Sequence, residues 1–484
     1  MKTKKILASI LAVASALTLT ACNQSENTPA DTTAPANTGN AANTDNGPAT
    51  EGGSVAATAQ QPADDVTIPE GLTLSVITNR TDRVDDGYFK NMVKPFEEKY
   101  KCTVEFEGIK KYNSDMATRM TTDQYGDVSC IPSKLALSDL SNYYIPLGSE
   151  AELSETYNWV NQKSYQGVCY GLPIKGDISS GIVYNKKVWA DAGITKLPTS
   201  PEEFIEDLKK IKESNPDVIP YYTNFKDIFA SKEWEHLPLA VSGDPDYKNK
   251  ALIEKQDILV EGTPYYKIYS LMYDIMSDPT LIEADPVTSD WERAKIEIGE
   301  GKIGAMTLGG WAFGQIRDLA ANKDDIGYMP PPFNIDGKQY AETSADTAFA
   351  INKHIDQDHQ NLSWKFIQWF LSAESPFAKD ENGISTIKEG GVFPEGIDDF
   401  DGVELFTATP APEAIADVWD AINKESGVMF DEEAADRFVL KIEEAAILGE
   451  GKEVMDEILA ENNEKWNKTR DANEALNAYI ATLS

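Results

Sequence analysis

Segments patterned like β-strands alternate with segments patterned like α-helices, and this alternation constrains the fold more than any other feature. Apolar and polar residues alternate over 72–77, and 103–107 and 127–131 have the composition of two further strands. Between these strands, 88–100 has large apolar residues at helical spacing, and 115–122 is a shorter helical segment. This order predicts a parallel sheet covered by helices, with ligands gathering at the carboxyl ends of its strands.

A second unit of the same kind is expected after Pro173. Its clearest helix is 202–213, because Ser200 is a capping residue, Pro201 falls in the first turn, and acidic residues follow at the positive end of the helix dipole. The 484 residues would suffice for about three domains of ordinary size, or for two large ones once any unfolded segment is subtracted. Further helices are expected over 264–276, 289–299, 362–371, 412–424 and from 432 almost to the end of the chain.

The N-terminal segment lacks the pattern of a folded domain. Lysines precede a short apolar run, 6–19, which is too short to span a bilayer as a stable helix. The tetrapeptide Leu-Thr-Ala-Cys that ends at Cys22 resembles the lipobox of bacterial lipoproteins, in which cleavage precedes a lipid-linked cysteine. This resemblance predicts a signal peptide over 1–21, and the polar, small residues of 22–65 predict a disordered tether behind a lipidated Cys22. We expect the mature protein at the extracytoplasmic face of the bacterial cell membrane, held there by this anchor alone.

Composition excludes several classes of partner. The chain has 80 acidic and 44 basic residues and a net charge of −36, so a nucleic acid would be repelled. It has 3 His and 4 Cys, too few to favour a zinc site, and we expect neither a metal nor a cofactor. Beyond the lipobox, Cys102, Cys130 and Cys169 can form at most one disulfide. Their apolar and β-prone neighbours favour buried free thiols, and the choice stays open.

A series of short motifs resembles the family 1 extracellular solute-binding proteins. Residues 165–173 match the family's Gly-x-x-Tyr-Gly-Leu-Pro strand, 181–187 its Tyr-Asn-Lys strand end, and 192–194 its Ala-Gly-Ile turn. Residues 199–204 match the helix start that follows, with one inserted residue. The motifs occur in the family's order, and the likeness spans nearly all of the chain from Leu72 onward. It resumes at 301–306, 309–311, 326–330, 348–352 and 364–371.

The resemblance implies an α/β fold of the periplasmic-binding-protein type, with two lobes, a ligand cleft between them and hinge closure on binding. The family includes the carbohydrate-binding lipoproteins of ABC importers, of which maltodextrin-binding protein is the best-known relative. We therefore expect a monomer that captures a sugar or oligosaccharide and delivers it to permease subunits driven by a cytoplasmic ATPase. By this likeness the lobes comprise 66–172 plus 326–375 (lobe 1) and 173–325 plus 376–484 (lobe 2), with crossovers near Pro173 and at 329–332.

The expected sugar site combines flat aromatic rings with carboxylates, because sugar C–H faces pack on rings while hydroxyls need donors and acceptors. Trp311 is the first candidate, since the family motif places a stacking aromatic after two glycines. A tryptophan in the core is the alternative. Asp177 matches a position where relatives present a carboxylate, although most acids are surface charges. Arg80 and Asp82 lie in the loop after the first strand, where a solvated turn is equally expected.

Four further residues are weaker candidates. Tyr221 and Tyr222 end an expected strand of lobe 2, and Trp419 lies where the family often adds a second aromatic platform. For these three, packing in the core is at least as strong an alternative. Asp346 departs from a glycine-rich stretch that is common in the family, and it could supply an extra acceptor.

The rival interpretation is a surface glycoside hydrolase, for which two positioned carboxylates suffice. With 80 acids in 484 residues, some carboxylate pair will occur at any chosen spacing. The sequence has no nucleophile elbow, no His-Glu-x-x-His motif and no phosphate-binding loop, so we predict no catalytic residue. A lipoprotein that presents its ligand to a sensor is a third possibility. The sugar, its linkage and its length stay open.

Overall fold

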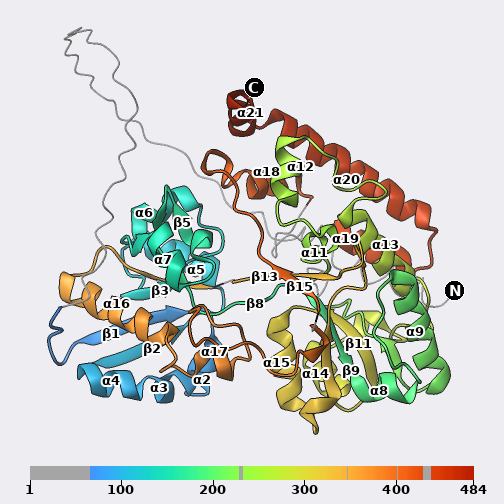
Figure 1. Ribbon diagram of the computed structural model, residues 1–484, viewed down its shortest axis with the longest axis horizontal. Helices are drawn as coiled ribbons and strands as arrows, with labels where there is room; N and C mark the ends of the chain where they lie inside the picture. Colours follow the sequence, from blue (N-terminus) through green and yellow to red (C-terminus); the bar gives the residue numbers. More distant parts are fainter. Residues whose placement is uncertain (1–65, 228–232, 346, 401, 429–437, 484) are drawn as a thin grey trace, which may run out of the picture. The chain divides into compact units, whose positions relative to one another are not determined.

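The largest of the four sheets in the described residues is built mainly from the N-terminal third of the chain (Figure 1). The computed structural model describes residues 66–227, 233–345, 347–400, 402–428 and 438–483, which belong to one unit, Ala59–Ser484. The strand order is β2-β1-β3-β14-β7, in which β1 runs parallel to β2 and β3 while β14 runs antiparallel to β3 and β7. The bounds are β1 Thr73–Thr78, β2 Thr103–Gly108, β3 Val128–Cys130, β7 Leu172–Pro173 and β14 Ala348–Ile351.

Helices cover this sheet as the βαβαβ pattern predicts. The segment predicted as one helix over 88–100 forms two, because Pro95 in the first turn of α4 has no N–H to continue the preceding helix. Phe96 is fully buried and packs edge-on against Phe366 of α16, which closes the core of lobe 1. The bounds are α2 Thr81–Asp85, α3 Tyr88–Met92, α4 Lys94–Tyr100, α5 Tyr112–Met120 and α16 Gln357–Leu371.

The second sheet forms lobe 2 and has its own hydrophobic core. Its order is β10-β11-β9-β12, with β10 parallel to β11 and β9 antiparallel to both of its neighbours. The predicted helix over 202–213 is α9, Pro201–Ser214, and the Ser200 hydroxyl caps it by accepting from the Glu203 N–H. The strands are β9 Gly181–Asn185, β10 Ile219–Tyr221, β11 Ile303–Leu308 and β12 Ile326–Met329. Its main helices are α8 Lys186–Asp191, α9, α13 Pro264–Met276, α14 Trp291–Gly299 and α15 Gly310–Leu319.

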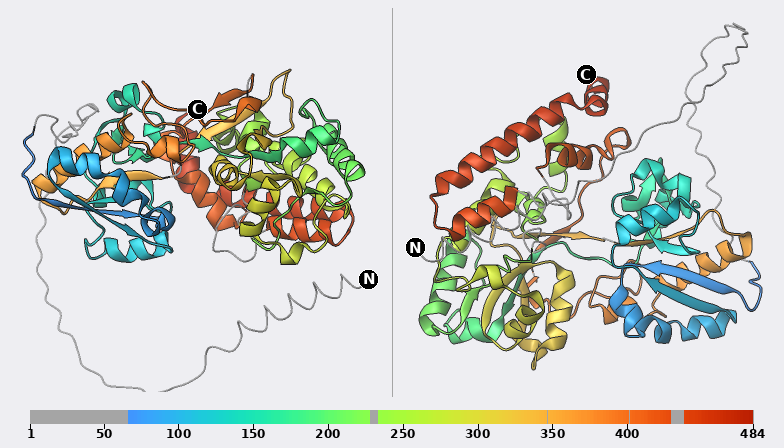
Figure 2. Two further views of the ribbon diagram at one scale, coloured as in Figure 1. Left: turned by 90° about the horizontal axis from the view of Figure 1, so that it is seen from below. Right: turned by 180° about the vertical axis from the view of Figure 1, so that it is seen from behind.

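The C-terminal region adds helices to lobe 2. The helix expected from 432 almost to the end is divided in the described residues into α19, α20 and α21, since Gly449 takes a left-handed φ of 67° and Asn473 caps α21. Trp466 of α20 is fully buried in the lobe 2 core. Figure 2 shows the long helix α20 from two further sides. The bounds are α18 Val418–Ser426, α19 Phe438–Ile447, α20 Lys452–Ala472 and α21 Glu474–Thr482.

Two extended strands connect the lobes. After β7 the chain runs through β8, Asp177–Ile178, into β9, and after β12 it returns through β13, Tyr340–Ser344, into β14 (Figure 2). β13 pairs with β8 and with β15, Glu404–Phe406, in a small sheet of its own. The expected boundary at residue 326 therefore differs from the observed pairing, because β12 lies beside β9 in the lobe 2 sheet. Strand pairing over such a sequence separation could not be deduced from local pattern.

A third connection follows α17, Phe377–Asp380. Phe377 is fully buried in the core of lobe 1, although residues from 376 onward were expected in lobe 2. Ile384 then exchanges two backbone hydrogen bonds with Gly176, of 2.7 and 2.8 Å, and Ile397 and Phe400 reach the lobe 2 core. The chain thus crosses between the lobes three times, as the expected lobe bounds implied, but the third crossing lies beyond Phe377 and not at 375/376.

The predicted lipid anchor lies outside the described residues, whereas the three other cysteines lie within them. Cys22 and the tether lie outside the described residues, and no helix within those residues is long and apolar enough to cross a bilayer. Cys102, Cys130 and Cys169 form no disulfide within the described residues, and Cys102 is half-buried while the other two are buried. Burial raises the pKa of Cys102 to about 11 and that of Cys169 to about 12, which makes both thiols unreactive at neutral pH.

Candidate functional site

The parallel strands β10 and β11 bring two loops together at one edge of the lobe 2 sheet. Gly309 and Gly310 follow β11 directly, and α15 begins there. A Cβ on Gly309 would lie 2.5 Å from the Trp311 ring and 3.0 Å from Glu233 Oε2, and one on Gly310 would lie 3.0 Å from the Ile178 carbonyl oxygen. The glycines therefore allow the tryptophan, an acid and the crossing strand β8 to approach the same turn.

Trp311 lies in the first turn of α15 and is half-buried. Its Nε1 donates a hydrogen bond of 3.3 Å to Glu233 Oε1, and its ring centroid lies 5.7 Å from that of Trp291. Two contacts hold the indole, and part of its surface remains exposed. This is the arrangement that an aromatic platform needs.

Glu233 was not singled out from the sequence. Its side chain is almost fully buried, at 4% exposure, and its bond to Trp311 spans 78 residues. No spacing or motif near Glu233 pointed to this contact. The tertiary fold alone makes it a neighbour of the predicted platform.

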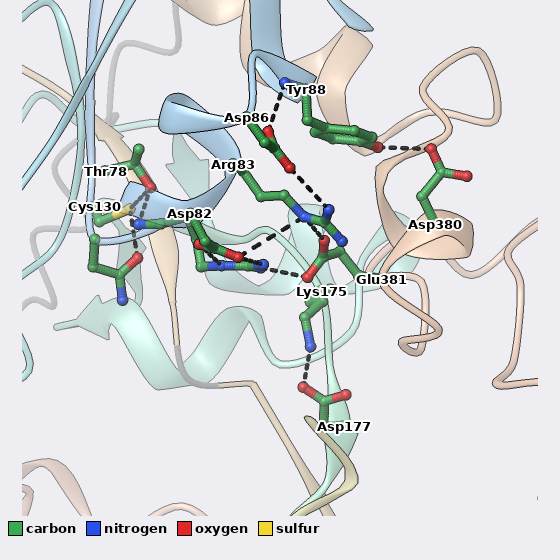
Figure 3. A network of polar contacts seen from close by, with 12 residues as sticks. Thr78, Asp82, Arg83, Asp86, Tyr88, Cys130, Lys175, Asp177, Asp380 and Glu381 are labelled. Atoms are coloured by element: carbon green, nitrogen blue, oxygen red, sulfur yellow. Dashed lines mark hydrogen bonds and ion pairs between the residues drawn. The ribbon is translucent and has the colours of Figure 1, made fainter. Parts of the chain in front are cut away.

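Asp177 of β8 lies beside the same turn. Its Cβ would be 3.6 Å from a Cβ on Gly310, and its carboxylate forms an ion pair with Lys175 (Figure 3). Asp177 and Glu233 both act on the buried phenol of Tyr328, whose pKa is raised chiefly by burial and further by these two charges. Asp177, Glu233 and Trp311 thus gather at one place, and we call them the Trp311 cluster.

The two predicted tyrosines belong to the core. Tyr221 is 1% exposed, and its hydroxyl donates to Thr307 Oγ1 at 2.9 Å. Tyr222 is 7% exposed, and its hydroxyl accepts from the Asp290 N–H at 2.9 Å. Both rings therefore take the core position that the sequence had left as the alternative, and neither presents a face for stacking.

Trp419 is also packed. It is 9% exposed, contacts Trp466 edge-on at 5.6 Å, and has the Lys248 ammonium 5.8 Å from its ring centroid. The adjacent Asp417 accepts a 3.3 Å hydrogen bond from the Leu137 N–H of lobe 1. Neither Trp466 nor Lys248, the two residues that contact the Trp419 ring, belongs to the Trp311 cluster. Asp346 lies outside the described residues.

Arg80 and Asp82 lie at the corresponding edge of lobe 1, and they bind each other. Arg80 donates to Asp82 through Nε at 3.0 Å and Nη2 at 2.7 Å. Its Nη1 forms an ion pair with Glu381, which also accepts from Arg83 Nε at 2.7 Å. We call Arg80, Asp82, Arg83 and Glu381 the Arg80 cluster.

Glu381 makes this cluster part of the third connection. Its side chain is 8% exposed and lies between two guanidinium groups from α2 and its N-cap. Partial burial opposes charge on Arg80, but its bonds to Asp82 and Glu381 outweigh that effect and raise its pKa. Burial likewise works against ionisation of Asp82, yet the Arg80 hydrogen bond holds the pKa of Asp82 below its usual value. Each of these charges already has a partner within the protein.

The described residues contain no group of three or more His, Cys, Asp or Glu side chains that could hold a metal ion. What the two edges can offer is hydrogen bonding and an aromatic face. Such groups can bind a polar ligand that has apolar patches.

Comparisons with known proteins agree with this geometry. The family model for bacterial extracellular solute-binding proteins matches residues 81–375, which is more than half of the chain. Among curated proteins, the diacetylchitobiose binding protein DasA of Streptomyces coelicolor is 28% identical over 326 residues, or 64% of this chain and 70% of that protein.

Solved structures extend the likeness to nearly all of the described chain. BlMnBP1, an ABC transporter binding protein of Bifidobacterium animalis subsp. lactis solved with mannobiose, is 33% identical with a TM-score of 0.76. The match covers 83% of this chain and 95% of BlMnBP1. BlMnBP2, a manno-oligosaccharide-specific protein of the same organism solved with mannotriose, is 30% identical with a TM-score of 0.75. That match covers 84% of this chain and 96% of BlMnBP2. The chain is therefore a member of the bacterial extracellular solute-binding protein family, with the two α/β lobes typical of its sugar-binding relatives.

Proposed function

We propose that this protein is the lipid-anchored substrate-binding protein of an ABC importer and captures a short oligosaccharide between its lobes. The Trp311 cluster supports the proposal most directly. It combines a half-buried indole with two carboxylates at the carboxyl edge of the sheet, where ligands of α/β folds gather. The ring would pack on a sugar C–H face, and the carboxylates would accept hydrogen bonds from hydroxyls.

The relatives narrow the ligand class. DasA is named for a disaccharide of N-acetylglucosamine, and the two Bifidobacterium proteins were solved with mannobiose and mannotriose. We therefore propose a neutral di- or trisaccharide as the ligand. Ligand would favour the closed arrangement of the lobes only through its better fit to that arrangement.

Calorimetry across a panel of manno-, chito- and gluco-oligosaccharides, with product analysis of each mixture, tests the proposal. We expect saturable binding of one di- or trisaccharide series and no cleavage products. Conversion of any glycan into smaller products would favour the surface hydrolase instead. Flat titrations across the whole panel would contradict the assignment to sugars.

Anchoring and delivery need separate tests. We propose that Cys22 carries the lipid and that the protein works as a monomer that passes its ligand to permease subunits. Labelling with a radioactive fatty acid should mark the wild-type protein and fail to mark Cys22→Ser. Uptake of the bound glycan should stop when the gene is deleted. Normal uptake together with loss of a glycan-dependent response would point to a sensor as the partner.

A further inference from the structure

We propose that Asn224 is a specificity-determining residue of this site, whose side-chain amide hydrogen-bonds a hydroxyl of the bound sugar. The proposal rests on the proposed function and goes further, because it assigns a role to a residue that neither the sequence motifs nor the aromatic platform indicated. It arises from a polar group that is buried without a partner.

The Asn224 side chain is fully buried, and among the described residues neither Oδ1 nor Nδ2 has a hydrogen-bond partner. Folding removes such an amide from water and normally supplies partners in return, so a buried amide with both atoms unsatisfied destabilises the protein. Natural proteins retain such groups mainly where function needs them.

The loop around Asn224 is well ordered by its own bonds. Glu283 accepts from the Thr223 N–H at 2.9 Å and from Thr223 Oγ1 at 2.6 Å, and Thr223 Oγ1 in turn accepts from the Phe225 N–H at 3.1 Å. Further along, the Lys226 N–H donates to Ser289 Oγ at 2.9 Å. The unsatisfied amide therefore does not result from a loosely packed loop.

The backbone of Asn224 is in the left-handed region, with φ of 53°. Asparagine tolerates this conformation better than most residues, but it still costs free energy relative to an ordinary turn. Burial without partners and an unusual backbone occur at the same residue. Such coincidences are typical of ligand-binding positions, where the surrounding structure enforces the conformation.

The register places Asn224 at the edge that carries the Trp311 cluster. Tyr221 of β10 is aligned with Ala305 of β11 in a parallel pair, so Asn224 lies three residues beyond the aligned pair, level with Leu308. Leu308 is directly followed by the Gly309-Gly310 turn that leads into Trp311. The amide and the indole thus come from neighbouring strand ends.

An amide suits a sugar hydroxyl because it offers two donors and one acceptor, and a hydroxyl can both donate and accept. A site whose buried polar group depends on a ligand hydroxyl rejects an analogue without that hydroxyl, since the group would stay unsatisfied. Asn224 should therefore distinguish the true ligand from a deoxy analogue, whereas stacking on Trp311 should not.

The test compares stability with affinity in Asn224→Gly, which removes the amide and accepts the left-handed backbone. We expect the thermal midpoint of the unliganded protein to be unchanged or higher. Affinity for the glycan identified in the panel should fall at least tenfold. Asn463→Ala is the matched control, because Asn463 is 7% exposed but fully bonded, to the Ile258 and Leu259 N–H groups and to Asp257. The control should lower the midpoint and leave affinity unchanged.

Monodeoxy analogues of the glycan provide the second measurement. One monodeoxy analogue should bind wild-type protein more weakly than the parent glycan does. Asn224→Gly should bind that analogue and the parent glycan with equal affinity, since the bond is already absent. If Asn224→Gly binds the glycan as tightly as wild type, the proposal is overturned, and the partner of the amide is a buried water and not the ligand. A drop in midpoint as large as that of Asn463→Ala overturns it too, because it would show a structural role. If wild-type protein binds no glycan of the panel, the proposed function itself fails.

Discussion

The two lobes present polar groups at equivalent edges of their sheets, but they use them differently. In lobe 1, the Arg80 cluster pairs each guanidinium with a carboxylate and ties α2 to the third connection. In lobe 2, the Trp311 cluster leaves an indole half-exposed, and Asn224 beside it has an amide with no partner among the described residues. One edge is internally satisfied, and the other retains capacity for a ligand.

This difference teaches that location at a strand end is not enough to assign a binding residue. Arg80 and Trp311 follow the carboxyl ends of β1 and β11 and were both expected to contact a sugar. What separates them is what remains for a ligand: the polar atoms of both side chains have partners, but part of the apolar Trp311 ring stays exposed. The following changes test that distinction.

Replacing Trp311 should have the largest effect. Trp311→Ala removes the aromatic platform, and we expect a loss of roughly 2 to 4 kcal/mol in binding free energy, and at least tenfold in affinity, as for other buried aromatic anchors. Calorimetry with the identified glycan measures it. Tyr100→Ala is the control, because this half-buried ring at the end of α4 precedes β2 and so lies at the opposite edge of its sheet. Equal losses in both variants would mean that Trp311 is not the platform.

Removing the acid of the Arg80 cluster should affect stability first. Glu381→Ala leaves two guanidiniums without their shared carboxylate, and we expect the free energy of unfolding to fall by about 2 kcal/mol, less than for a fully buried pair. Urea unfolding measures this. Asp82→Asn should lose about 0.5 kcal/mol or less, because Asp82 is 59% exposed. If Glu381→Ala weakened glycan binding as much as Trp311→Ala, the lobe 1 edge would be a binding surface after all.

The core assignment of Tyr221 predicts a smaller effect. Tyr221→Phe removes the 2.9 Å hydrogen bond to Thr307, so we expect a loss of about 1 kcal/mol in unfolding free energy. Affinity for the glycan should not change. A variant with wild-type stability and reduced affinity would contradict the core assignment and indicate that Tyr221 binds the glycan.

Glu283, the buried acid that is bonded to Thr223, should give the smallest effect, a dependence of stability on pH. Burial raises the pKa of Glu283 above its usual 4.5 despite the bonds from Thr223. The protonated Glu283 carboxyl therefore stabilises the folded state fully below pH 4.5, and this stabilisation is lost as the pH rises through the raised pKa. Glu283→Gln does not titrate, so its stability relative to wild type should increase from pH 4.5 to 7.5. Urea unfolding of both proteins across this range measures the difference, and a constant difference would contradict the raised pKa.

The sequence predicts the fold much better than the site. The expected strands at 103–107 and 127–131 and the expected helix at 264–276 agree closely with β2, β3 and α13, since local periodicity reports which face of a segment is buried. The family motif pointed to Trp311, which is half-buried and bonded to Glu233, and its role as a sugar platform stays a prediction. Periodicity could not separate Tyr221, which is in the core, from a strand-end residue that faces a ligand.

Contacts that form only in the folded chain account for the rest. Arg80 meets Glu381 across 301 residues, and Glu233 meets Trp311 across 78. Asn224 was missed for another reason, because asparagine in a loop is ordinarily solvated or part of a turn. Its lack of partners becomes visible only when every neighbour is placed.

The order of strands in the first sheet has a consequence for the synthesis of the chain. β14, which begins at Ala348, lies between β3 and β7. A polypeptide that emerges from its N-terminus therefore exposes an open edge of β3 until about three-quarters of the 484 residues are available. By then all four strands of the other sheet have emerged. The lobe 1 sheet is therefore completed only after every strand of the lobe 2 sheet is available, and a chain stopped before Ala348 would present an unpaired strand edge to chaperones and proteases.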